Sequence, residues 1–229
     1  WNDFDIGLTA EIHSTDGHDP FISADAQTVS DLAESTSASY APGSAHYGWD
    51  NEDIRFSVAK NNWRILADYM RHSNLDIGLT GAGVIDPVTQ ASDSRYNIDL
   101  IYKNNTFSKN WGLDAKLSYL NLDYTSGDGF QERPPGYTNT DGTYPDGQIN
   151  QMKAAERRVN TEISGIYSGI KDHSLRLGAG YTQQDLYSVE QFVNFGTGAD
   201  GNPITPGDPL VNISDTPFAF APEKKRKIS

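Results

Sequence analysis

The sequence predicts an all-β fold: an antiparallel up-and-down meander, part of a large transmembrane β-barrel with short periplasmic turns and long extracellular loops. First, segments of about ten residues, close to the length that crosses a bilayer, alternate between apolar and polar side chains. In Phe4–His13, for example, Leu8 and Ala10 flank Thr9. Second, short turns and long loops connect these segments in turn. Third, aromatic residues mark the segment ends, as they do at the membrane interfaces of such barrels.

Seven segments have the period of two residues that is typical of strands with two different faces. In chain order, the expected strands are Phe4–His13, Ile54–Lys60, Trp63–Arg71, Arg95–Lys103, Trp111–Tyr124, Glu156–Ser168 and Ser174–Tyr187. The residues from Glu223 onward resemble the start of an eighth strand. We therefore treat 1–229 as one partial β-barrel domain.

The connections alternate in length. The short ones are Asn61-Asn62, Asn104–Asn110 and Gly169–His173. The long ones are 14–52, His72–Asp93, Thr125–Ala155 and 188–222, all rich in the turn residues Gly, Pro, Asn and Asp. Ala24–Glu34, inside the first long loop, has the composition of a short helix. A soluble sandwich has no reason to place all its long loops at one end, so this order favours a barrel.

The alternation divides the side chains of these strands between two environments. On the apolar face we expect four leucines to contact lipid: Leu113, Leu117, Leu175 and Leu177. On the polar face we expect nine charged residues to face a water-filled or polar lumen, because buried charge needs water or polar partners. These residues are Asp5, Glu11, Arg64, Asp68, Asp99, Asp114, Lys116, Glu162 and Arg176. Trp63, Trp111, Tyr69, Tyr119, Tyr124, Tyr167 and Tyr181 fit aromatic girdles, although aromatic residues also favour strands in general.

Composition excludes several other classes of protein. The net charge of −13 and a pI near 4.6 disfavour nucleic-acid binding, which needs a basic surface. The absence of cysteine excludes disulfides and thiolate metal sites. No run of 18 apolar residues exists, and the mean hydropathy of −0.60 suits strands that bury only alternate residues. The chain starts at Trp1 without a signal peptide, so we expect an internal piece of a larger protein.

Four segments carry a family resemblance. Trp1–Leu8, Asn62–Tyr69 and Trp111–Tyr119 resemble barrel strands of TonB-dependent outer-membrane receptors, and Phe220–Ser229 resembles the approach to a mid-barrel strand there. The resemblance implies roughly the first third of a 22-stranded barrel, without the plug domain or the TonB-contacting segment.

This resemblance implies an outer-membrane transporter that actively takes up a scarce ligand, such as a siderophore, haem, cobalamin or an oligosaccharide. The implied partners are the small-molecule ligand, outer-membrane lipid, and the TonB energy-coupling protein acting through the missing plug. Two alternatives remain open. One is a passive porin-like channel with the same wall, and the other is a soluble β-rich module that binds carbohydrate or calcium.

Ligand-binding candidates lie in the third long loop, where Phe130, Arg133, Tyr137 and Tyr144 combine stacking surfaces with a cation. The alternative is that these side chains pack against one another. The acidic residues Asp128, Asp141 and Asp146 suggest Ca²⁺, although Asp-Gly is also ordinary turn chemistry. His13, Asp16, His18 and Asp19 match no standard metal site. No nucleophile elbow or other catalytic constellation is present, so we expect no enzyme. The basic run 224–227 suits a strand end beside anionic lipopolysaccharide.

Overall fold

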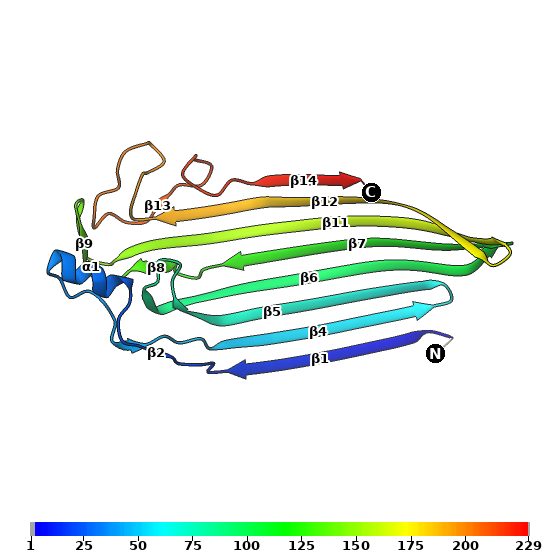
Figure 1. Cartoon of the computed structure of the whole chain (residues 1–229), viewed down its shortest axis with the longest axis horizontal. Coiled ribbons are helices and arrows are strands. Elements are labelled where there is room, and N and C mark those ends of the chain that lie inside the picture. The colour runs from blue at the N-terminus through cyan, green and yellow to red at the C-terminus, as the bar shows by residue number, and fades with distance from the viewer. Residues whose placement is uncertain (1–2, 229) are drawn as a thin grey trace.

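In the computed structural model, one long antiparallel sheet runs through the molecule (Figure 1). The structure describes residues 3–228. Trp1, Asn2 and Ser229 lie outside the described residues; they belong to the first and last segments that carry the family resemblance. Neighbouring strands follow the chain order and are all antiparallel. They are β1 (Asp5–Thr15), β4 (Trp49–Lys60), β5 (Trp63–Leu79), β6 (Ile85–Ser108), β7 (Trp111–Thr125), β11 (Gln148–Ile170), β12 (His173–Val193) and β14 (Glu223–Ile228).

The predicted all-β, antiparallel up-and-down arrangement is therefore confirmed. The sheet formed by residues 3–228 is open, with β1 and β14 at its edges rather than joined into a closed barrel. No helix among these residues is long and apolar enough to cross a membrane.

Three two-residue turns lie at one end of the sheet, at 61–62, 109–110 and 171–172. Each contains one residue in the left-handed backbone region, with φ of 53° at Asn61, 68° at Asn110 and 61° at Asp172. Asn and Asp tolerate this conformation better than most residues, which explains where the chain turns. The expected turns Asn104–Asn110 and Gly169–His173 are too long, because β6 continues to Ser108 and the β11–β12 turn is 171–172.

The strands extend further toward the opposite end than the alternation predicts. The expected loop His72–Asp93 is wrong: β5 continues to Leu79 and β6 starts at Ile85, leaving a turn of 80–84 with register shifts beside it. Strands β4, β11 and β12 also extend into regions expected to be loops, to Trp49, Gln148 and Val193. These extensions mix turn residues such as Asn74, Gly78 and Pro87 with apolar residues such as Ile85 and Val193, so the regular alternation that identifies a strand is interrupted.

The remaining long connections form a compact layer, which we call the loop cap (residues 16–48, 126–147 and 194–222). It contains β2 (Phe21–Ile22), α1 (Ala26–Glu34), β3 (Gly43–Ser44), β8 (Phe130–Arg133), β9 (Tyr137–Asn139), β10 (Gly142–Tyr144) and β13 (Val211–Asn212). The short helix expected at Ala24–Glu34 is present. The buried apolar side chains lie in this cap or at its junction with the strands: Ala45, Val84, Ile85, Ala91, Tyr144, Val193, Ile204 and Ile213.

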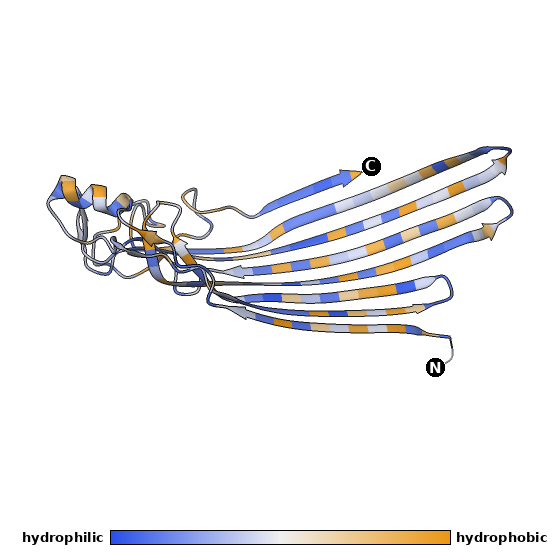
Figure 2. Cartoon of the chain, turned by 60° about the horizontal axis from the view of Figure 1, so that its bottom comes forward, coloured by the Kyte–Doolittle hydropathy of each residue, from blue (hydrophilic) through white to orange (hydrophobic). Residues whose placement is uncertain are grey.

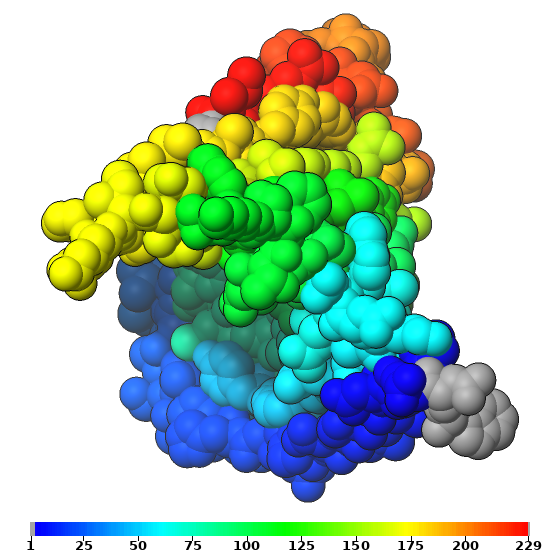
Figure 3. Space-filling view, turned by 90° about the vertical axis from the view of Figure 1, so that its right-hand side faces the viewer, coloured from blue at the N-terminus to red at the C-terminus, as the bar shows by residue number. Residues whose placement is uncertain are grey.

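The sheet is bowed. Seen from the end with the short turns, it curves around a hollow, and residues between β1 and β4 lie beyond that hollow (Figure 3). Apolar and polar residues alternate along the long strands, whereas β14 is polar over most of its length (Figure 2). The fold therefore presents two chemically different faces over one curved wall.

Candidate functional site

The strand register assigns side chains to the two faces, because directly paired residues of antiparallel strands point to the same side. Leu117 pairs with Leu100 of β6 and Thr161 of β11, while the next residue, Ser118, pairs with Asp99 and Asn160. We call the side of Leu117 the apolar face and the side of Ser118 the polar face. All four leucines expected to contact lipid are on the apolar face, and all nine charged residues expected in the lumen are on the polar face. That these faces contact lipid and a lumen stays a prediction.

The apolar face is uncovered. Many of its large side chains are exposed, whereas Leu113 is half-buried. Those that are 38–85% exposed include Ile6, Leu8, Ile12, Ile54, Phe56, Ile98, Leu100, Leu117, Ile163, Leu175 and Leu177. Soluble monomers rarely expose a continuous apolar patch of this kind, and such patches mark contact with a membrane or a partner.

Aromatic pairs bound this apolar band. Near the short turns, the Trp63 and Tyr102 ring centroids are 4.8 Å apart, and those of Trp111 and Tyr167 are 5.0 Å apart. On the side of the loop cap, the Tyr96 and Tyr119 centroids are 5.9 Å apart. Tyr124, also expected in a girdle, instead pairs with Asp93 on the polar face, which corrects that assignment.

The edge of the band nearest the cap crosses the hydrogen-bonded rows at a slant. The continuous apolar run ends at Ile12 on β1, at Tyr119 on β7 and at Tyr181 on β12; Tyr187 lies on the same face beyond this run, past Gln183 and Asp185. Following the pairs across the sheet, the row of Tyr181 reaches β1 at Ile6, six residues before Ile12. Six residues along a strand span about 20 Å, and the six pairings between β1 and β12 span about 29 Å. The band is therefore inclined by roughly 35°, within the strand tilt of barrels.

The polar face carries charges of both signs in close pairs. Lys116 Nζ lies 3.0 Å from Asp99 Oδ2. The Arg55 guanidinium donates to both carboxylate oxygens of Asp53, over 2.9 and 2.6 Å. Neither Asp53 nor Arg55 is among the nine expected lumen residues: the expected second strand starts at Ile54 and leaves out Asp53, whereas Arg55 lies inside that strand, on its polar face. Opposite charges at alternate strand positions were the signal that could have found them.

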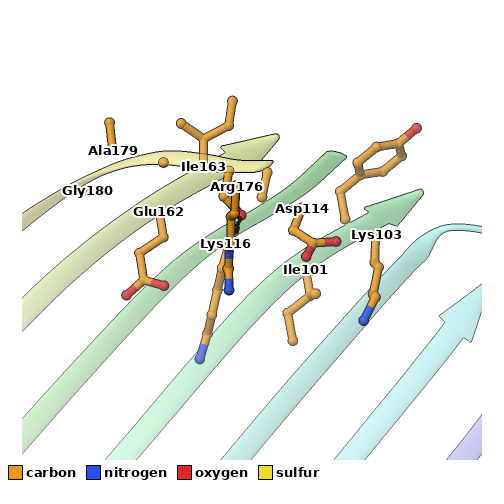
Figure 4. Close-up of a pocket in the computed structure, with 13 residues that line it drawn as sticks. Ile101, Lys103, Asp114, Lys116, Glu162, Ile163, Arg176, Ala179 and Gly180 are labelled. Atoms are coloured by element: carbon orange, nitrogen blue, oxygen red, sulfur yellow. Dashed lines mark hydrogen bonds between the residues drawn. The ribbon is translucent and has the colours of Figure 1, made fainter. Parts of the chain in front are cut away.

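A hollow of about 460 Å³ opens on the polar face near the short turns (Figure 4). Lys103, Lys116, Glu162 and Arg176 point to this side of the strands, whereas Ile163 points to the other. Arg176 donates to Ser164 Oγ over 3.0 Å, and Asp114 Oδ1 is buried without a hydrogen-bond partner among the described residues. The hollow therefore offers both cations and acceptors to a polar neighbour.

In the loop cap, three of the four ligand-binding candidates come together. The Arg133 guanidinium carbon lies 5.2 Å from the Tyr137 ring centroid, and Tyr137 stacks on Tyr144 at 6.0 Å. Tyr144 is only 1% exposed, so this stack is internal to the cap and offers a ligand no surface of Tyr144. Phe130 lies on β8, which pairs with β11.

The cap is held by buried carboxylates rather than by a large apolar core. Asp25 caps helix α1 through the Thr28 N–H, 2.8 Å from its Oδ1, and also accepts the Ile85 N–H at 3.0 Å. Burial alone would raise the pKa of Asp25, but the hydrogen bonds from Ile85, Ser39 and Thr28 outweigh it and lower the pKa. Burial raises the pKa of Glu132, and the nearby negative charge of Asp86 raises it further.

The expected metal ligands are dispersed. Asp128 and Asp146 flank separate turns, and Asp141 lies between β9 and β10. His46 Nδ1 lies 2.9 Å from Asp19 Oδ1, a contact between two exposed side chains. Within residues 3–228, no group of three or more His, Cys, Asp or Glu side chains is arranged to hold a metal ion.

Comparisons of the chain with models of protein families, with curated proteins and with solved structures found no match.

Proposed function

We propose that this chain forms part of the wall of a large β-barrel in a bacterial outer membrane, and that the barrel takes up a scarce small-molecule ligand. The observation that carries the proposal is the slanted apolar band on the uncovered face. Its length along β7, from Trp111 to Tyr119, is about 27 Å, which at a tilt of about 35° gives a height of about 22 Å. The apolar belt of outer-membrane barrels is about 25 Å tall.

The polar face supports a lumen that is wet or filled by polar protein. Mixed charges such as Asp99 and Lys116 are tolerated beside water or a polar plug, but not beside lipid. The energy-coupled, TonB-dependent mode of uptake rests on the family resemblance of the strands. The loop cap lies at the end that faces the outside of the cell in this proposal.

The placement of the two faces is tested with neighbouring cysteines in the full-length protein, since this segment has no native cysteine. Leu117→Cys and Ser118→Cys lie on opposite faces of the same strand. In outer membranes, we expect a membrane-impermeant maleimide to label Ser118→Cys from the lumen, while Leu117→Cys reacts only with a lipid-soluble reagent. Equal labelling of both positions by the water-soluble reagent, in a protein found in the soluble fraction, would favour the soluble binding module.

Energy coupling needs a separate test. For an active transporter, a protonophore abolishes uptake of ligand by intact cells but leaves surface binding unchanged. Uptake that continues after the proton gradient has collapsed would favour the passive channel instead.

A further inference from the structure

Three cations gather on the apolar face just beyond its apolar band. Arg157 of β11 and Lys224 of β14 flank Asp185 of β12, and Arg226 lies one row closer to the band, opposite Gln183. We call Arg157, Lys224 and Arg226 the outer basic cluster. On these strands the band ends at the next row, where Ile228 pairs with Tyr181.

One buried carboxylate orients the cluster without neutralising it. Asp185 Oδ2 accepts from Arg157 Nε over 3.2 Å, and Asp185 Oδ1 lies 3.5 Å from Lys224 Nζ. The Asp185 side chain is only 5% exposed, whereas those of Arg157 and Lys224 are each 47% exposed. The cluster and Asp185 together carry a charge of +2, in a chain whose total is −13, and Asp123 on the same face accepts a hydrogen bond from Asn121.

Arg157 is also fixed by an aromatic ring. Its guanidinium carbon lies 5.0 Å from the Tyr187 ring centroid, and the Tyr187 hydroxyl donates to Asn121 Oδ1 over 3.1 Å. A stacked and paired arginine loses little side-chain freedom when it binds an anion, and its planar donors suit phosphate oxygens.

From this arrangement we propose that the outer basic cluster binds the phosphorylated headgroup of an anionic membrane lipid. The acyl chains would lie along Ile228, Tyr181 and Leu177, which are 82%, 36% and 59% exposed on the same face. Basic groups at the edge of an apolar surface are typical of anionic-lipid recognition, because charge and hydrophobic contact then act on one molecule. This inference rests on the proposed membrane location.

The same strands provide a matched control. Lys225 of β14 and Arg158 of β11 both pair with Gln184, and Lys227 of β14 pairs with Thr182. These three cations therefore point to the polar face. The triple variant Arg157→Gln, Lys224→Gln, Arg226→Gln and the control triple Arg158→Gln, Lys225→Gln, Lys227→Gln remove the same charge from opposite faces.

The experiment measures binding of a diphosphorylated glycolipid to the full-length protein in detergent by native mass spectrometry. Each cation near an anionic lipid contributes about a factor of five, so we expect the first triple variant to lose at least roughly tenfold in affinity. The control triple should bind like the unmodified protein. A variant that keeps the charges, with Arg157→Lys and Arg226→Lys, should retain most of the affinity.

Three results would overturn the lipid site: equal losses in both triple variants, equal binding of the enzymatically dephosphorylated glycolipid, or displacement of the lipid by millimolar inorganic phosphate. The last result would mean that the cluster recognises phosphate without a lipid. A protein that assembles in the outer membrane and gives any of these results refutes this inference alone. A protein that stays in the soluble fraction refutes the proposed function before lipid is added.

Discussion

Introducing arginine at several depths along one strand tests whether the apolar face contacts lipid. Ala115, Leu117 and Asn121 all lie on the apolar face of β7, at increasing distance from the centre of the band. The control on the polar face is Ser118→Arg, on the same strand. The strand and the introduced residue are the same in all these variants, so they differ in the environment of the arginine and in the side chain that it replaces.

The expected magnitudes follow from the geometry. The band on β7 runs from Trp111 to Tyr119, so Ala115 is at its centre and Leu117 is about 7 Å further along the strand, or about 6 Å in height. An arginine costs about 2–4 kcal/mol at the centre of a bilayer and about 0–1 near its edge. We therefore expect about 2–4 kcal/mol for Ala115→Arg, about 1–2.5 for Leu117→Arg, and less than about 1 for Asn121→Arg.

The assay measures reversible unfolding of each full-length variant in phospholipid vesicles by urea titration. Ser118→Arg should change the free energy of unfolding little. If this face were in water, an arginine at the 46% exposed Leu117 would cost within about 0.5 kcal/mol, as at most surface sites. A flat response from Ala115 to Asn121 would refute the lipid assignment.

The remaining predictions concern the loop cap. Asp25 has a lowered pKa, so its stabilising effect is complete above the ordinary value near 3.8 and is lost as pH falls through the lower folded-state pKa. Asp25→Asn should therefore speed hydrogen exchange of α1 at neutral pH, and this difference should shrink in acid. Glu132 has a raised pKa, the opposite case, so Glu132→Gln should slow exchange in β8 at neutral pH; faster exchange would contradict this reasoning. Gly147 has φ of 78°, and an added Cβ would lie 2.2 Å from the Arg133 carbonyl oxygen, so Gly147→Ala should open the cap to limited proteolysis. Gly201→Ala, with a similar φ of 81° but open space around it, should do so much less, and equal cleavage of both variants would contradict the role of the clash.

The two-faced strands could be predicted because a period of two residues is a local property. Leu113 to Tyr119 shows it without any knowledge of neighbours, and the register then follows from keeping apolar residues on one side. The tight turns were likewise evident from residues such as Asn61 and Asn110. For this reason the expected lipid-facing and lumen-facing residues each fall on a single face.

The strand extensions and the cap could not be predicted in the same way. Residues 73–79 and 85–94 pair through backbone hydrogen bonds, but register shifts interrupt the pairing and their apolar residues are mixed with Gly, Pro, Asn and Asp, so the composition resembles that of a loop. The cap depends on contacts between distant residues, such as the Asp25 carboxylate with the Ile85 N–H and the Arg133 guanidinium with the Gln27 amide. No period in the sequence encodes such pairs. From the sequence alone, Tyr137 and Tyr144 fit a ligand site as well as they fit the internal stack that they form.

In the proposed membrane, the molecule would divide its stabilisation between water and lipid. The cap buries Ile204, Ile213 and Tyr144 and satisfies its carboxylates internally, so it can be stable in water. The wall has no such core: hydrogen bonds join its strands, but side chains such as Leu8 and Leu177 remain 72% and 59% exposed. Full burial of an exposed leucine contributes about 1.5–3 kcal/mol, and these partly exposed side chains would contribute a share of that in an apolar surrounding. In the proposed membrane, lipid would therefore help to stabilise this wall, and the slant of the band indicates how the wall would lie in it.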